Sequence, residues 1–521
     1  MQTTLPSYYR IDKGTTSTSV VASQKRLRPS GMPQDIEPPA AIIHAAPAGL
    51  ARNEQAALDK CPVEVVELIG SFLESDQDVK NFRATCRHVH HNIEGHNGSF
   101  WRDRFLESFD QPHTPMSNVE YKRLYQARKR LFTNGATFRF GHSSQEMVCL
   151  EMLRDMAIES YTQYNCGAAI PSKASKNITF LKRFAQSHAI LDAIFNPRHK
   201  STPGSRRDNF PRPTEPLLQV IQVMFAPCLL SVEFGDDAYR YPETQQAAFS
   251  VTPWLCGAYN LNVDMELVLR QINYWRYHII RKAEYSLFEA FKDLEEKERP
   301  RFWQMQLEKG QKDRIGKRWK GAYAFCDDPE DVLHIRRIGD GLVDAFFNGE
   351  ESNPEEFQDI QLQLQPEGES TWPTDFEKVL HSLKQPQAKV VTRSQKASIP
   401  ADERDRWVSQ SFRFAGDGVD AKGPVFYDGW LNPLPSQEGV PGWQRMTMMK
   451  YQILDDESSI DLESLYAYEG IVLPGGQILV GRWWSTYSEY GKDMYSGPFI
   501  MWCVDDEDDG IAEAAKAQEE T

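Results

Sequence analysis

The hydrophobic pattern of this chain changes near Gly310, and this change constrains the fold more than any other feature of the sequence. Before this point, apolar residues recur every three or four positions, which is the period of amphipathic helices. After it, short runs rich in aromatic and β-branched residues alternate with turn residues, which is typical of strands. Many short strands joined by turns predict an antiparallel β-barrel or sandwich. The predicted fold class is therefore α+β, with a helical N-terminal part and a C-terminal β domain.

The predicted elements follow this division. Helices are expected at 144–161, 178–195 and 216–224, and along a long stretch from 261 to about 307. Strands are expected at 319–325, 333–335, 360–364, 408–414, 424–430, 443–453, 465–473, 477–484 and 495–504. A type II turn is expected at Leu473–Gln477, because proline and glycine stand where this turn needs them. Residues 366–407 are polar and have no clear period, which indicates an insertion.

Composition limits the class of protein. The 521 residues suffice for about two to four domains, and their net charge of −15 argues against general nucleic-acid binding. No apolar run approaches the roughly 18 residues that a membrane helix needs, so no membrane contact is predicted. The eight cysteines include no Cys-x-x-Cys pair. The sequence therefore predicts neither a disulfide framework nor a zinc site, and it favours a reducing, intracellular setting.

Five regions are expected along the chain. Residues 1–54 are rich in Ser, Thr, Pro and Ala and are predicted to be disordered, as is the acidic tail 505–521. Between them we expect a small helical unit at 55–109, a helical linker domain at 110–310 and the β domain at 311–504. The basic run Lys25–Arg28 is a candidate nuclear-import signal, although most short basic runs are solvated tail. The predicted location is the cytoplasm, the nucleus or both.

Residues 58–105 carry a compact run of helical signals. Pro62 suits the first turn of a helix, where a missing N–H has no cost, and Glu64 and Glu67 meet the positive end of the helix dipole. The apolar residues of two helices are spaced for one face each: Val65, Leu68, Ile69, Phe72 and Leu73, then Val79, Phe82, Cys86 and Val89. A unit of this length buries little surface by itself. It either packs on the rest of the protein or completes its core on a partner.

The order of these residues resembles an F-box. The resemblance rests on Leu58, Cys61-Pro62, Glu64, Leu68-Ile69, Phe72-Leu73, Val79, Phe82 and Thr85-Cys86-Arg87, and on the closing segment 99–105. Cys61 and Phe82 stand where leucine is common in the family. The resemblance implies a three-helix F-box that docks on the Skp-type adaptor, and through it on the cullin, of an SCF ubiquitin ligase. The side chains that it assigns to this contact are Pro62, Val65, Leu68, Ile69, Leu73, Val79 and Phe82.

The C-terminal block resembles the C-terminal region of a group of fungal F-box-domain proteins. The resemblance rests on residues 468–476, 481–484 and 496–502, and on 429–431 and 441–447 before them. It implies a substrate receptor whose β-barrel holds a target protein and which performs no chemistry itself. The sequence does not identify the target.

Motifs for catalysis or metal binding are missing from the sequence. His88, His90, His91 and His96 are spaced so that three imidazoles do not share one helical face, so we expect solvated side chains rather than a metal site. Gly416–Gly418 opens a glycine-rich turn between expected strands, whereas a phosphate loop needs a helix after it. We therefore predict a protein that is not an enzyme and has no cofactor.

The candidate contacts for a target or a ligand are Arg445, Arg482 and Trp484. Along a strand, Trp484 shares a face with Arg482, and Trp483 has the opposite face. A guanidinium on such a face suits a carboxylate or a phosphate, but arginines of a packed barrel can equally pair with its own acids. The alternative function is a β-barrel that binds a small ligand, or an enzyme, whose N-terminal helices are only structural.

Overall fold

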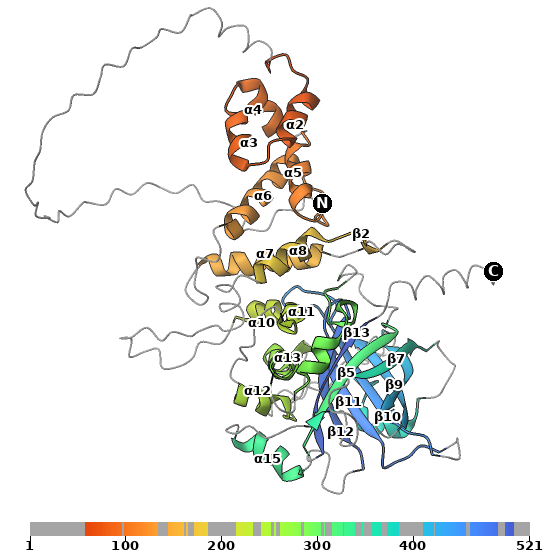
Figure 1. Cartoon of the computed structure of the whole chain (residues 1–521). Helices are drawn as coiled ribbons and strands as arrows, with labels where there is room; N and C mark the ends of the chain where they lie inside the picture. Colours follow the sequence, from red (N-terminus) through yellow and green to blue (C-terminus); the bar gives the residue numbers. More distant parts are fainter. Residues whose placement is uncertain are drawn as a thin grey trace, which may run out of the picture. The chain divides into compact units, whose positions relative to one another are not determined.

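The computed structural model divides the chain into two compact units (Figure 1). The first comprises the residues up to Ser108 together with Thr114–Arg130, and the second comprises Phe109–His113 and the residues from Leu131 onward. The structure describes residues 58–95, 98–133, 144–160, 163–164, 171–185, 215–232, 241–251, 255–256, 261–282, 286–303, 307, 315–326, 328–338, 346–347, 357–365, 372–384, 410–420, 423–454, 459–487 and 495–504. The predictions for the two tails, for Lys25–Arg28 and for His96 lie outside these residues.

The first unit is helical. Its helices are α2 (Val63–Ser71), α3 (Asp76–Arg83), α4 (Arg87–Glu94), α5 (Phe100–Ser108) and α6 (Asn118–Thr133), of which the residues up to Arg130 belong to this unit. The Ser75 hydroxyl oxygen accepts a hydrogen bond from the Asp78 N–H at 3.0 Å and so caps α3, as an N-cap serine commonly does. The core is formed by side chains from all five helices: Val66, Val79, Val89, Ile93, Phe100, Trp101, Phe105, Tyr121, Leu124 and Tyr125.

The second unit combines helices with a barrel. Its helices are α7 (Ser144–Glu159), α8 (Lys176–Ala185), α10 (Pro216–Met224), α11 (Ala226–Leu229), α12 (Tyr241–Ala248), α13 (Met265–Ile280), α14 (Phe288–Asp293), the 3₁₀ turn η3 (Glu296–Glu298), α15 (Pro329–Ile338) and α16 (Thr374–Leu380). Two short antiparallel pairs join β1 (Gln163–Tyr164) to β2 (Pro171–Lys173) and β3 (Leu255–Cys256) to β4 (Asn262–Val263). In the described part of the chain, no helix has both the length and the apolar character to cross a membrane.

Within the described residues, eight strands close an antiparallel barrel, which confirms the predicted α+β class and decides between barrel and sandwich. The strands are β5 (Arg318–Phe325), β7 (Gln358–Leu364), β8 (Phe412–Asp420), β9 (Gly423–Pro433), β10 (Gln444–Tyr451), β11 (Tyr466–Val472), β12 (Ile478–Ser485) and β13 (Ser496–Cys503). Each strand from β7 to β13 pairs with the next, β7 also pairs with β5, and β13 returns to β5 to complete the circle. The short β6 (Phe346–Phe347) adds to β5.

Side chains alternate between the barrel interior and its outer wall, as the pleat of a strand requires. The interior is filled by large residues from every strand: Trp319, Phe325, Ile360, Leu362, Phe414, Val425, Tyr427, Leu431, Met446, Met448, Tyr468, Val472, Leu479, Trp483, Phe499, Met501 and Cys503. An eight-stranded barrel is just wide enough for its own side chains to fill. The interior is therefore a packed core.

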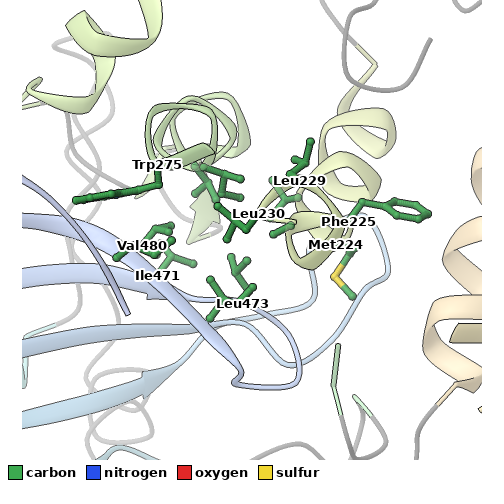
Figure 2. Close-up of a cluster of buried hydrophobic side chains, with 14 of the residues drawn as sticks. Met224, Phe225, Leu229, Leu230, Trp275, Ile471, Leu473 and Val480 are labelled. Atoms are coloured by element: carbon green, nitrogen blue, oxygen red, sulfur yellow. The ribbon is translucent and has the colours of Figure 1, made fainter. Parts of the chain in front are cut away.

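A second core lies between the helices and the outer wall of the barrel. Figure 2 shows Trp275 of α13 beside Val480 and Ile471, with Leu229 of α11 and Leu473 close by. Trp275, Ile471 and Val480 have no solvent-exposed surface. The helical segment that we expected to form a separate linker domain therefore shares a core with the barrel from Leu131 onward.

Three sequence predictions differ from the structure. Residues 333–335 belong to helix α15 rather than to a strand, because Pro329 and the acids Glu330 and Asp331 form a favourable first turn. The stretch from 261 to 307 is not one helix: α13 ends at Ile280, where Arg281 adopts an extended backbone, and α14 begins at Phe288. Gly416–Gly418 lies inside β8, and the tight backbone comes later, at Gly423 with φ of +117°.

The polar insertion 366–407 contains one helix that the sequence pattern did not predict. This helix, α16, covers part of the outer wall, where Phe376 and Leu380 pack against Met449 of β10 and Trp484 of β12. Two buried apolar residues in a seven-residue helix are too few to produce a recognisable period. The helix is therefore held by tertiary packing more than by its own pattern.

The turn after β11 has the predicted geometry. The Gly476 N–H donates to the Leu473 carbonyl oxygen at 2.9 Å, and Gly475 has φ of +85°, as position i+2 of a type II turn requires. A Cβ on Gly475 would lie 2.1 Å from the Cβ of Trp303. Glycine is needed here for both backbone conformation and close approach.

We expect Gly475→Ala to lower the free energy of unfolding by about 2–4 kcal/mol, because the added methyl group overlaps Trp303 and the backbone is strained. The matched change is Gly423→Ala, where φ is also positive but no atom lies within 4 Å of the added Cβ. It should cost only about 1–2 kcal/mol. Urea denaturation followed by tryptophan fluorescence checks both, and equal losses would contradict the close contact.

Burial lowers the pKa of His278 to about 3. The ring lies among Tyr274, Tyr277 and Phe347 and stays neutral in the folded protein, whereas an unfolded chain protonates it below about pH 6.5. The free energy of unfolding is therefore unaffected by protonation of His278 above about pH 6.5. As the pH falls from there toward 3, protonation of this ring in the unfolded chain lowers the free energy of unfolding by up to about 1.4 kcal/mol per pH unit. His278→Phe should reduce this acid slope in urea titrations at several pH values. The same change at the exposed His334 is the control, and an equal effect of both would contradict the assignment.

Candidate functional site

Most of the large apolar side chains of helix α2 point away from the core of the first unit. Its inward positions are small: Val66 is fully buried, and Gly70 lies so close to α5 that an added Cβ would stand 2.7 Å from the Phe100 ring. The outward positions are Val65, Leu68, Ile69 and Phe72, which are 40, 55, 37 and 77% exposed. We call these four residues the α2 face. Single exposed apolar residues are ordinary on a protein surface, but a continuous group of them marks a contact site.

The N-terminal end of α5 is tied to α2 by Glu67. One carboxylate oxygen accepts hydrogen bonds from the N–H groups of Ser99 at 2.9 Å and Phe100 at 3.3 Å, and the other accepts from the Ser99 hydroxyl at 3.0 Å. The carboxylate therefore satisfies the free N–H groups at the start of α5 and meets the positive end of its dipole. Glu67 therefore binds α2 to α5, while the apolar side of α2 is exposed to solvent.

The C-terminal end of α2 is held by Arg104. Its guanidinium donates to the carbonyl oxygens of Leu73 at 2.8 Å and Glu74 at 3.2 Å, and it pairs with Asp76 at 3.0 Å. The Tyr125 hydroxyl donates to the same carboxylate at 2.8 Å. Burial, and then the hydrogen bond to Asp76, raise the pKa of Tyr125 to about 12, so the hydroxyl keeps its proton. Since Glu67 fixes the middle of α2 on α5 and Arg104 fixes the segment after its C-terminal end, the α2 face is a preformed surface.

The seven residues predicted to contact an adaptor do not all lie on this surface. Pro62, Val65, Leu68 and Ile69 are exposed, and Leu73 and Phe82 are half-buried. Val79 is only 2% exposed and packs inside the unit, because it is the inward apolar residue of α3. The predicted set omitted Phe72, although this residue has the helical spacing of the same face and is its most exposed member.

The histidines near this surface are not gathered around a shared point. The Nε2 atom of His88 lies 2.8 Å from the carbonyl oxygen of Cys61, so this ring ties α4 to the segment before α2. His90 and His91 are exposed. Among the residues that the structure describes, no three His, Cys, Asp or Glu side chains are grouped to hold a metal ion.

The barrel interior offers almost no room for a ligand. A cavity of about 10 Å³ lies among Trp319, Phe414 and Met446, and this is the space of roughly one water molecule. Phenylalanine rings fill the barrel by lying over glycines of neighbouring strands. An added Cβ would stand 2.6 Å from the Phe414 ring at Gly429 and 2.3 Å from the Phe499 ring at Gly481. Contacts with other molecules must therefore use the outside of the barrel.

Arg445 is part of the structure of the outer wall. It is 4% exposed, and its Nε donates to Glu469 on β11 at 2.9 Å. Its two Nη atoms donate to the carbonyl oxygens of Leu380 at 3.1 Å and His381 at 3.3 Å, which end helix α16. The arginine thus holds α16 on the barrel, and its hydrogen bonds leave it little capacity for a further ligand.

Arg482 and Trp484 are placed differently. Both lie on the outer wall, with the guanidinium 4.8 Å from the centre of the Trp484 ring, whereas Trp483 points into the barrel and donates to the Ala324 carbonyl at 3.0 Å. Across the strand, Arg482 faces Glu469, which is already paired with Arg445. The Nε of Arg482 is buried without a hydrogen-bond partner. Trp484 is itself 7% exposed and packs against α16, so of the three candidate residues the half-buried Arg482 is the one left with capacity for an anionic group.

No protein family, curated protein or solved structure matches this chain. A function therefore has to follow from surfaces of the molecule itself. The α2 face and the outside of the barrel are two such surfaces among the described residues.

We expect Arg445→Met to lower the free energy of unfolding by about 2–4 kcal/mol, because it removes the partner of the half-buried Glu469 carboxylate and of two carbonyl oxygens. Arg482→Met should change it by less than about 1 kcal/mol, since only stacking on Trp484 is lost. Chemical denaturation of the two variants checks the difference. A large loss for Arg482→Met would show that this arginine, too, serves the structure.

Proposed function

We propose that this chain is the substrate-receptor subunit of an SCF ubiquitin ligase, with the α2 face docking on a Skp-type adaptor. The observation that carries the proposal is this face: four large apolar side chains, open to solvent on a helix that Glu67 and Arg104 hold against the rest of the unit. The F-box-like order of residues 58–105 supports the choice of partner. In this proposal the protein acts in the cytoplasm, the nucleus or both.

The exposed apolar area is large enough to matter for binding. Complete burial of one large apolar side chain contributes about 1.5–3 kcal/mol. Given how exposed the four residues are, covering the α2 face contributes roughly 5 kcal/mol before the entropy of association is subtracted. Half-buried Leu73 and Phe82 border the same helices and extend the contact. A groove lined by apolar side chains on the adaptor is the natural complement.

The barrel then has the second task, which is to hold a target protein. A receptor of this kind performs no chemistry, because its effect is to raise the concentration of a target lysine near a ubiquitin-conjugating enzyme. Arg482, stacked on Trp484, is a candidate contact for a carboxylate or phosphate of the target. The alternative of a barrel that encloses a small ligand is less favoured, because the cavity inside it holds roughly one water molecule.

The test is co-expression of the full chain with a Skp-type adaptor, followed by purification on a tag of the adaptor. We expect the two chains to co-purify, and we expect Leu68→Asp combined with Ile69→Asp to reduce the recovered complex by at least tenfold, because two charges would be buried in the contact. Both side chains are exposed, so the double variant should fold with an unchanged circular dichroism spectrum.

The matched control is Leu454→Asp combined with Leu462→Asp, which places the same charges on exposed leucines of the second unit. This control should recover the complex at the wild-type level. Failure of the well-folded wild-type chain to co-purify would overturn the proposal, as would equal recovery with the variant of the α2 face.

A further inference from the structure

A second group of exposed apolar side chains lies at one end of the barrel. Its members are Val419, Ile453, Leu454, Leu462 and Tyr487, which are 70, 40, 49, 61 and 59% exposed. We call these five residues the barrel rim. They come from segments up to about 70 positions apart in the sequence, so only the fold brings them to a common end.

The strand order explains why these residues lie at the same end of the barrel. Its residues lie in or beside the connections β8–β9, β10–β11 and β12–β13, and these hairpins open to the same end because neighbouring strands are antiparallel. Strands β8 to β13 are consecutive around the barrel, with a spacing of about 4.8 Å. Neighbouring hairpins are therefore roughly 10 Å apart, and together they span a length that suits an extended peptide segment.

Backbone hydrogen bonds hold the middle of the rim in place. Beyond the end of β10, Leu454 N–H donates to the Ser459 carbonyl at 2.8 Å and Asp461 N–H donates to the Gln452 carbonyl at 2.9 Å. The next hairpin is tied to this one, because Thr486 N–H donates to the Leu465 carbonyl at 3.1 Å. The apolar side chains of the rim are therefore carried on a defined backbone.

The described part of the connection between β10 and β11 is acidic. Its residues 452–454 and 459–465 include two carboxylates, Asp461 and Glu463, and no lysine or arginine. Asp461 and Glu463 stand on either side of Leu462, and the Asp461 carboxylate accepts the Glu463 N–H at 3.0 Å. This charge opposes contact with nucleic acid or anionic lipid, and the net charge of −15 opposes contact with a second copy of the chain.

We propose that the barrel rim docks a segment of a partner protein in which apolar side chains alternate with lysine or arginine. The apolar residues of the segment cover the rim, and its cations meet the carboxylates beside Leu462. We take this partner to be the target that is ubiquitinated, and this part of the inference rests on the proposed function. The docking itself does not depend on the adaptor.

The probe is a fluorescein-labelled ten-residue peptide of alternating leucine and lysine, titrated with the full chain and followed by fluorescence anisotropy. Its counterpart has glutamate in place of lysine. We expect the lysine peptide to bind at least tenfold more tightly than the glutamate peptide at low salt, and we expect this preference to shrink as salt is added.

Two variants of the rim separate its apolar and acidic parts. Leu454→Ser with Leu462→Ser should weaken binding of the lysine peptide about tenfold or more, because two apolar contacts are lost. Asp461→Asn with Glu463→Gln should weaken binding of the lysine peptide severalfold and remove most of its salt dependence. The asparagine side-chain oxygen can still accept the hydrogen bond from the backbone N–H of residue 463, so the local backbone should not change. The control, Val232→Ser with Val251→Ser, changes exposed apolar residues outside the rim and should bind as wild type does.

The α2 variant Leu68→Asp with Ile69→Asp distinguishes this inference from the proposed function. It should bind the lysine peptide as wild type does but should not co-purify with the adaptor. The rim variants should co-purify with the adaptor but should bind the lysine peptide more weakly. The inference is overturned if the rim variants bind the lysine peptide as wild type does, if the glutamate peptide binds equally well, or if the wild-type chain shows no binding up to about 1 mM.

Discussion

The pairing of β13 with β5 is the interaction on which most of this structure depends. It joins Phe499 to Tyr323 and Cys503 to Trp319, across a sequence separation of more than 170 residues, and it removes the two open edges that the sheet would otherwise have. Closure also creates two distinct surfaces. The interior must be filled by the barrel's own side chains, and the outer wall becomes the base on which α10, α11, α13 and α16 pack.

Closure has a direct consequence for function. In an eight-stranded barrel the interior is narrow, and here phenylalanines lying over Gly429 and Gly481 leave room for roughly one water molecule. Recognition is therefore left to the outside, where helices cover much of the wall. The hairpins at one end of the barrel remain open, and the barrel rim occupies that end.

The two proposed contacts follow the same physical logic in separate units. On the α2 face, Glu67 and Arg104 use the polar groups of the helix ends to fix α2, so its apolar side remains without a cover. On the barrel rim, backbone hydrogen bonds fix the hairpins while their leucines face solvent. Each surface is preformed, which limits the entropy lost on binding. A receptor that joins a ligase to a target needs two such surfaces that act independently.

Local sequence determined much of the secondary structure, because alternation and turn chemistry are properties of neighbouring residues. The strands from β9 to β13 begin and end within a few residues of the predicted limits, whereas β8 runs six residues past its predicted end. Pro474 with Gly475 specified the turn after β11. At α15 the alternation of Leu333 and Ile335 suggested a strand, although Pro329 and the acids after it favour the start of a helix. Local information was insufficient for α16, which depends on packing against the wall.

Only the tertiary structure decided which side chains are available. Periodicity placed Val65, Leu68 and Val79 on apolar faces alike, but packing buries Val79 and leaves the other two exposed, because the two helices turn different faces to the same small core. Arg445 and Arg482 look equivalent in the sequence. In the fold, Arg445 donates its hydrogen bonds to the end of α16, whereas Arg482 stacks on Trp484. A sequence specifies the face of each element; whether that face is covered depends on elements that are distant in the chain.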